Sequence, residues 1–116
     1  MEVTFVIETG ERDANGDKID LNGLKIPSDK VPILKDFDAL KFVGEATVFM
    51  EGGILKATAD IPKRLLGCYP AIGYTPIVRK KTNLSFESDI LESRLNVIGV
   101  SAKPNIDPAI KKINEQ

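Results

Sequence analysis

The chain contains no histidine among its 116 residues and only one cysteine, Cys68. Histidine is the commonest general base near neutral pH, so its absence excludes Ser-His and Cys-His hydrolase mechanisms. Zinc sites that use histidine are excluded as well, and a single thiol cannot build a thiolate site. One cysteine also permits no disulfide within the chain. We therefore expect no metal, no cofactor, and a fold held together by packing.

Long apolar runs and excess charge of one sign are also missing. No stretch approaches the roughly 20 apolar residues that span a bilayer, and the start of the chain lacks the pattern of a signal peptide. The formal net charge is −1, which offers no broad basic surface to nucleic acid. We expect one domain, residues 1–116, made in a cytoplasm, with neither membrane nor nucleic acid as a partner.

Short segments rich in β-branched and aromatic residues, separated by turn signals, dominate the sequence. The clearest pair is a hairpin of residues 41–50 and 54–61, joined around Gly52-Gly53. Pro32 places the segment 31–34 at a sheet edge or a strand start. Residues 88–95 fit either a strand or a short helix, because their periodicity does not separate the two. Strands are further expected at 3–9, 71–78 and 97–102.

These elements predict a mainly β fold, a small closed or partly open β-barrel or a sandwich, with one or two short helices. Residues 62–67 suit one helical turn, since Pro62 occupies its first position and Gly67 its stop. The C-terminal residues 107–116 predict a short helix capped by Asp107, or else a frayed tail.

One early segment has two interpretations. Asp13, Asn15 and Asp17 alternate as calcium ligands do, but Gly16 lies between the second and third oxygens and no bidentate glutamate follows. The alternative, which turn chemistry favours, is a polar turn around Asn15-Gly16.

Other reactive groups also have a plain structural alternative. A catalytic Cys68 competes with a buried apolar cysteine, and serine–lysine pairs compete with solvated loops. The carboxylates Asp36 and Asp38 would share a face on a strand, but a solvated loop is favoured. The basic run 79–81, followed by Thr82 and Asn83, predicts a solvated loop that could contact an acidic surface of a partner. The serine–lysine pairs are Ser101 with Lys103 and Ser28 with Lys30.

Four segments of the chain carry a resemblance to a known family. The first is an acidic turn, the second joins a Val-Pro strand to Gly44-Glu45-Ala46, the third contains Ile72-Gly73-Tyr74, and the fourth ends in Lys103-Pro104-Asn105. Their ranges are 12–19, 31–38 with 42–46, 69–74 and 96–105. In this order they resemble the capsid maturation (prohead) serine proteases of tailed phages, a family with a β-barrel core related to the herpesvirus assembly protease.

The resemblance places three side chains at the family's catalytic positions. Phe37 stands where the family has its histidine, Ala71 where it has the nucleophilic serine, and Asn96 where it has a supporting glutamate. A serine protease needs a nucleophile, a base and a group that orients the base. Phenylalanine accepts no proton, alanine has no nucleophile, and asparagine carries no charge. The resemblance therefore implies an inactive relative with no catalytic residues.

From this resemblance we expect a virion structural protein rather than an enzyme. Its expected role is a capsid decoration or auxiliary protein that binds the major capsid protein or another virion protein, with self-association also open. One alternative is a non-catalytic assembly accessory, or scaffold-binding module, that is absent from the mature particle. A second alternative is a divergent active protease, and a third is an unrelated small β-domain.

Overall fold

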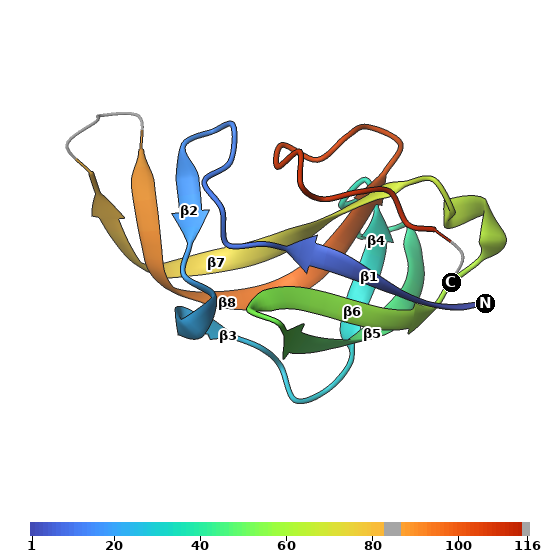
Figure 1. Ribbon diagram of the computed structural model, residues 1–116. Coiled ribbons are helices and arrows are strands. Elements are labelled where there is room, and N and C mark those ends of the chain that lie inside the picture. The colour runs from blue at the N-terminus through green and yellow to red at the C-terminus, as the bar shows by residue number, and fades with distance from the viewer. Residues whose placement is uncertain (83–86, 115–116) are drawn as a thin grey trace.

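The computed structural model describes residues 1–82 and 87–114 and consists almost entirely of strands (Figure 1). Eight strands form one mixed sheet in the order β1-β6-β5-β4-β8-β2, and β3 and β7 also pair with β8. The mainly β prediction is confirmed. The strands are β1 (Glu2–Glu8), β2 (Asp17–Ile19), β3 (Leu24–Lys25), β4 (Val31–Lys35), β5 (Phe42–Glu51), β6 (Ile54–Asp60), β7 (Tyr69–Lys81) and β8 (Ser88–Ser101).

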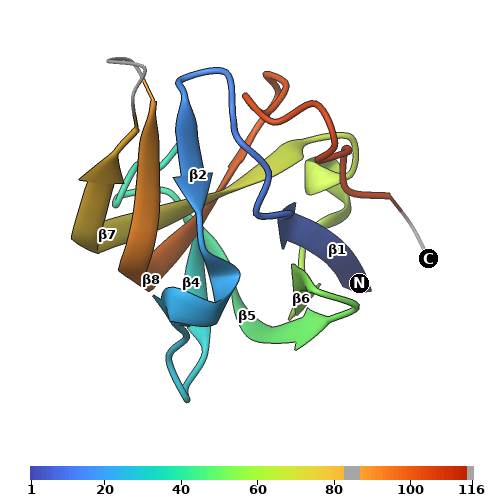
Figure 2. The same ribbon diagram turned by 60° about the vertical axis from the view of Figure 1, so that its left-hand side comes forward.

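The longest strand, β8, organises the sheet. Strands β2, β3 and β4 follow one another along one of its edges, all parallel to it, while β7 runs antiparallel along the other edge. Figures 1 and 2 show the far parts of β7 and β8 extending as an arm beyond the rest of the sheet, with β2 beside them. The helix alternative for residues 88–95 is therefore wrong, because partners distant in sequence hold this segment extended.

The predicted hairpin is confirmed as β5 and β6, in which Glu51 faces Ile54 across a two-residue turn. Gly52 and Gly53 both have positive φ, at 61° and 79°, which is the conformation this tight turn requires. Strand β4 begins at Val31, and its pairing with β8 starts only at Ile33. Pro32 thus stands at a strand start, where its missing N–H leaves no gap in the parallel ladder.

The sheet does not close into a barrel. Among the described residues, β1 pairs only with β6, and β7 pairs only with β8. The closed form of the predicted barrel is therefore wrong. The segment after β8 passes between these two strands, where the Asn105 amide donates to the Pro70 carbonyl at 2.7 Å and Thr9 donates to Asp107 at 2.6 Å. Polar side chains thus link the two strands that a closed sheet would pair directly.

The hydrophobic core lies on one face of the curved sheet. Alternate residues of β1 and β6 point into it, as the two-residue period of a strand requires. Strands β4 and β8 complete it, and Leu65 closes one end. The fully buried residues of this core include Ile7, Ile33, Leu55, Leu95 and Ile98.

Only two short 3₁₀ turns occur in the described part of the chain, η1 (Leu21–Gly23) and η2 (Lys63–Leu65). The second confirms the turn predicted over residues 62–67, and Gly67 ends it with a φ of 88°. None of the described helices has the length or the apolar character needed to cross a membrane.

The predicted C-terminal helix is wrong across residues 107–114. Asp107 does cap the amide of Ala109, but the Ile113 amide donates to the Cys68 carbonyl and Gly67 donates back to Ile113. These two bonds fix Ile113 beside residues 67–68, and Ile110 and Ile113 are both buried. Burial of two isoleucines against the sheet therefore overrides the helix capping signal.

Candidate functional site

The turn between β4 and β5 determines where Phe37 lies. The Lys35 amide donates to Lys41 and the Asp38 amide donates to Lys35, so residues 35–41 close a compact loop. Asp36 and Phe37 both adopt positive φ, at 54° and 57°, a conformation that costs free energy for residues other than glycine. The Asp36 amide donates to Val100 at 2.9 Å, and this bond anchors the turn to β8.

The Phe37 ring lies against the outer face of the β7–β8 ladder. A Cβ added at Gly99 would come within 2.3 Å of the ring, and one added at Gly73 would come within 3.2 Å. These two glycines therefore leave the space that the ring occupies. The ring is held from below by backbone, while its other side remains open, with 46% of the residue exposed.

Ala71 lies beside this ring. It pairs with Gly99 in the ladder, and together with Phe37 it lines a hollow of about 410 Å³. Most of the lining is apolar, and it includes Pro70, Ile72, Pro104 and Ile106. Two of the three side chains that the resemblance assigns to catalytic positions thus meet in one hollow, where neither of them can accept a proton or attack a carbonyl.

Asn96 does not join them. The β7–β8 register shifts between Gly73 and Tyr74, which face Val97 and Leu95 respectively, so Asn96 is the extra residue of a bulge. Its exposed amide donates to the Thr75 hydroxyl at 2.7 Å, away from the hollow. Asn96 therefore positions a neighbouring strand side chain rather than any group in the hollow.

Ser101 and Lys103, one of the two serine–lysine pairs considered from the sequence, both line the hollow. The Ser101 hydroxyl accepts the Lys103 backbone N–H at 3.2 Å, which forms a local turn. The Lys103 side chain belongs to an exposed residue, whereas a lysine that acts as a general base needs a desolvated amine. The Ser101 hydroxyl thus has no activated lysine base beside it.

The remaining reactive candidates lie elsewhere. Ser28 and Lys30 are exposed, and the Lys30 amine donates to Thr47 at 2.9 Å. Cys68 is half-buried, and its backbone pairs with Ile113. Asp36 and Asp38 occupy the β4–β5 turn rather than a strand, and Asp38 caps the amide of Leu40. The expectation of a loop for these two carboxylates is confirmed.

The early acidic segment forms the polar turn that was favoured over a calcium loop. Asp13 Oδ1 accepts from the amides of Asn15 at 2.8 Å and Asp17 at 3.0 Å. Asp17 then pairs with Arg79 at 3.3 Å across to β7. The carboxylates at the two ends of this turn therefore already have partners within the fold.

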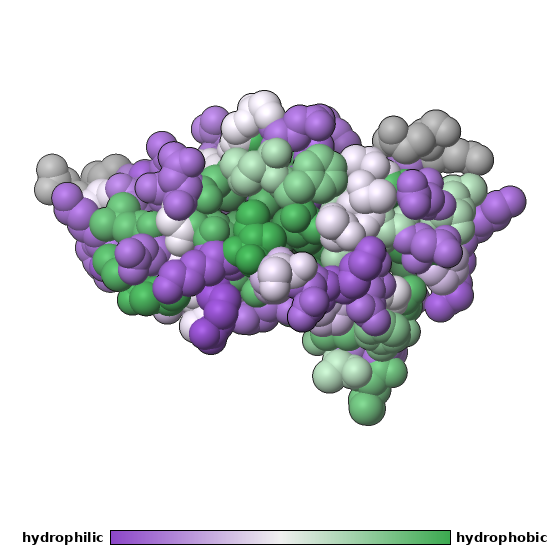
Figure 3. Space-filling model, turned by 90° about the horizontal axis from the view of Figure 1, so that it is seen from below, coloured by the Kyte–Doolittle hydropathy of each residue, from purple (hydrophilic) through white to green (hydrophobic). Residues whose placement is uncertain are grey.

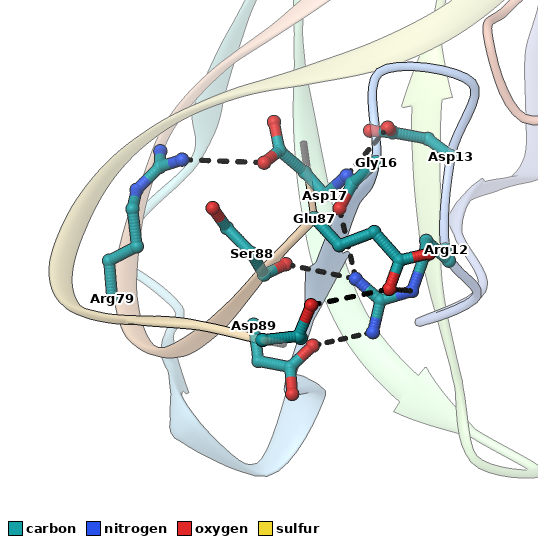
Figure 4. Close-up of polar contacts among 9 residues, drawn as sticks. Arg12, Asp13, Gly16, Asp17, Arg79, Glu87, Ser88 and Asp89 are labelled. Atoms are coloured by element: carbon teal, nitrogen blue, oxygen red, sulfur yellow. Dashed lines mark hydrogen bonds and ion pairs between the residues drawn. The ribbon is translucent and has the colours of Figure 1, made fainter. Parts of the chain in front are cut away.

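Arg12 clamps the same turn to the arm (Figure 4). Its guanidinium donates to Asp89 at 2.6 Å and to the Gly16 carbonyl at 2.9 Å, with Glu87 nearby at 3.8 Å. The predicted loop at residues 79–81 is wrong, since these residues end β7, where Lys80 and Lys81 pair with Asp89 and Ser88. Asn83, which completes that run, lies outside the described residues.

A carboxylate pair near the gap between β1 and β7 was missed. Burial raises the pKa of Glu8 above its ordinary value. The Gly10 amide, which donates to Glu8 at 3.0 Å, opposes this shift of the pKa, and the nearby Asp107 makes a smaller upward contribution. Asp107 is itself buried. The sequence marked Asp107 only as a helix cap, and nothing in the sequence placed Glu8 beside it.

Comparison with known proteins adds no further assignment: no protein-family model, no curated protein and no solved structure matches this chain.

Proposed function

We propose that this chain is a non-catalytic virion protein, a capsid decoration or auxiliary protein that binds the shell of the major capsid protein of a tailed phage. In this proposal its open sheet is a partly open variant of the prohead-protease barrel, in which the catalytic positions hold Phe37, Ala71 and Asn96. The single observation that carries the proposal is the Phe37 ring, which occupies the space above Gly73 and Gly99 next to Ala71.

The physical argument starts from what this hollow contains. A serine protease needs a nucleophile and a base within hydrogen-bond reach of each other. Here an aromatic ring and a methyl group fill the corresponding places, and the chain has no histidine to substitute. A rigid sheet that has lost such groups still presents a fixed surface, and many symmetric copies on a shell need only a modest interface each.

Binding to expanded capsids tests the proposal. We expect the purified chain to co-sediment saturably with capsids at micromolar concentration and to leave the capsid and scaffold polypeptides uncut. The variants Ser101→Ala and Cys68→Ala should bind as the parent does, because neither side chain has a role in this account. Failure to co-sediment, or cleavage of a shell or scaffold protein, would count against the proposal.

A divergent protease is the second candidate, because Ser101 and Lys103 line the same hollow as Ala71. If this candidate were correct, a serine-reactive phosphonate probe would label the folded chain, and labelling would disappear in both Ser101→Ala and Lys103→Met. We expect no labelling of the parent chain above that of Ser101→Ala.

A further inference from the structure

The β4–β5 turn carries an unusual concentration of exposed apolar side chains. Leu40 at its tip is 94% exposed and Phe42 is 57% exposed, and Phe37 lies at the base of the same turn. Figure 3 shows the turn as an apolar projection at the lower edge of that view. Contiguous exposed apolar groups of this kind are uncommon on monomers and mark interaction surfaces. We call Phe37, Leu40 and Phe42 the apolar knob.

The hollow described above adjoins this knob. Phe37 belongs to both, and Leu40 follows it by three residues on the same short turn. Ile106, which also lines the hollow, is itself 48% exposed. At about 410 Å³ the hollow is within the size range of protein binding pockets, and it has room for a leucine or phenylalanine side chain. One chain therefore carries a projecting apolar group and an apolar recess side by side.

The charges around the two features are also complementary. Lys103 and Asp36, one charge of each sign, are both among the residues that line the hollow. The knob is flanked by one charge of each sign, Asp38 and Lys41. When the same surface meets itself across a two-fold axis, opposite charges can face each other, and no net repulsion opposes contact.

We propose that the knob and the hollow form a self-complementary interface, in which Leu40 of each copy enters the hollow of a second copy of this chain. A two-fold axis between the adjacent knob and hollow makes both insertions at once, and the contact is closed rather than filament-forming. Each insertion covers the open side of the Phe37 ring. This inference goes beyond shell binding and is independent of it, because the partner is the chain itself.

Sedimentation equilibrium across a concentration series tests the interface. We expect the parent chain to form dimers, and Leu40→Asp to raise the dimer dissociation constant at least about tenfold, because a central apolar anchor dominates such contacts. The matched control is Leu91→Asp, an exposed leucine on the arm, which should leave the constant unchanged. Circular dichroism checks that each variant is folded.

Site-directed cross-linking locates the contact independently. In a Cys68→Ala background, a chain with Leu40→Cys is mixed with a chain with Pro104→Cys, whose position lines the hollow. We expect a mixed disulfide dimer that does not form when Leu91→Cys replaces Leu40→Cys. A parent chain that stays monomeric at high micromolar concentration would overturn the inference, as would dimers insensitive to Leu40→Asp. Loss of capsid co-sedimentation by Leu40→Asp from a monomeric parent would assign the knob to the shell and also overturn it.

Discussion

The two ends of the β7–β8 ribbon are held by different forces. At the inner end β8 packs Ile98 and Val100 into the core, with β4 beside them, and Phe37 covers Gly99 from the outer side. On the arm, the β7 residues Ile77 and Val78 are exposed. The arm buries Ile19 and Ile90 outside the main core cluster, and polar contacts also join Arg12 to Asp89 and Arg79 to Asp17.

This difference shows that one continuous ladder need not be uniformly stable. Apolar burial at the inner end contributes most of the free energy of folding, and partly exposed ion pairs contribute little. We therefore expect the arm to open locally at a lower free energy than the inner end. The predictions below test this contrast, beginning with the largest expected effect.

Truncation of Ile98 to alanine should cost the most stability. Ile98 is fully buried in the core, so Ile98→Ala leaves a cavity and should lower the free energy of unfolding by about 2–5 kcal/mol. Chemical denaturation followed by circular dichroism measures this change. Val97→Ala is the control, since the neighbouring side chain points to the outer, partly exposed face and should cost clearly less. Equal costs would contradict the assignment of faces on β8.

Gly99→Ala tests the position of the Phe37 ring. The new methyl group would lie 2.3 Å from the ring, so we expect a loss of about 1–3 kcal/mol from overpacking. In a Phe37→Ala background the obstacle is gone, and Gly99→Ala should then cost much less. A double-mutant cycle by urea denaturation measures the difference. Additive costs would show that the ring does not lie on Gly99.

Glu8 is an ionisable side chain that is partly buried in the folded protein. Its ionised form should therefore lower the free energy of unfolding. Burial raises the pKa of Glu8 above the ordinary 4.5, so the folded state favours the neutral form. Its favourable contribution is complete below the ordinary pKa and is lost as the pH rises through the raised native pKa. We expect Glu8→Gln, which keeps an acceptor for Gly10, to raise the thermal midpoint at neutral pH but not in acid. An equal effect at both pH values would refute this.

Removal of the clamp at Arg12 should act locally. Arg12→Gln loses the ion pair to Asp89, so we expect faster hydrogen exchange of backbone amides in residues 88–92, with almost no change in the global midpoint. The effect should shrink as salt concentration rises, since partly exposed pairs are screened. Arg64→Gln, at an exposed site within η2, is the control. A large global loss would mean that the arm and the inner end unfold together.

The features that could be predicted from the sequence are those set by neighbours along the chain. The β5–β6 hairpin follows from Gly52-Gly53 and alternating apolar residues, and the Asp13 turn follows from its own side chain. The extended state of residues 88–95 depends on β2, β3 and β7, whose contacts no local pattern contains. Likewise, the C-terminal helix signal is overridden by the pairing of Ile113 with Cys68.

The candidate site divides in the same way. The resemblance placed Phe37 and Ala71 in one region, and the structure puts both in one hollow. Asn96 lies apart because a one-residue bulge in β8 redirects it, and a bulge cannot be located from sequence alone. The exposure of Leu40 could not be predicted either, because the sequence of a short turn does not determine the direction in which the turn projects.

The proposal that this chain is a virion protein is tested most directly by quantitative mass spectrometry of mature particles of a tailed phage whose genome carries the coding sequence. The account predicts that the intact chain is present at a fixed ratio to the major capsid protein. It also predicts that the capsid and scaffold proteins carry the same cleaved termini in particles made with this chain and in particles made without it. Absence of the chain from purified particles, or the loss of specific cleaved ends when it is removed, would contradict the account.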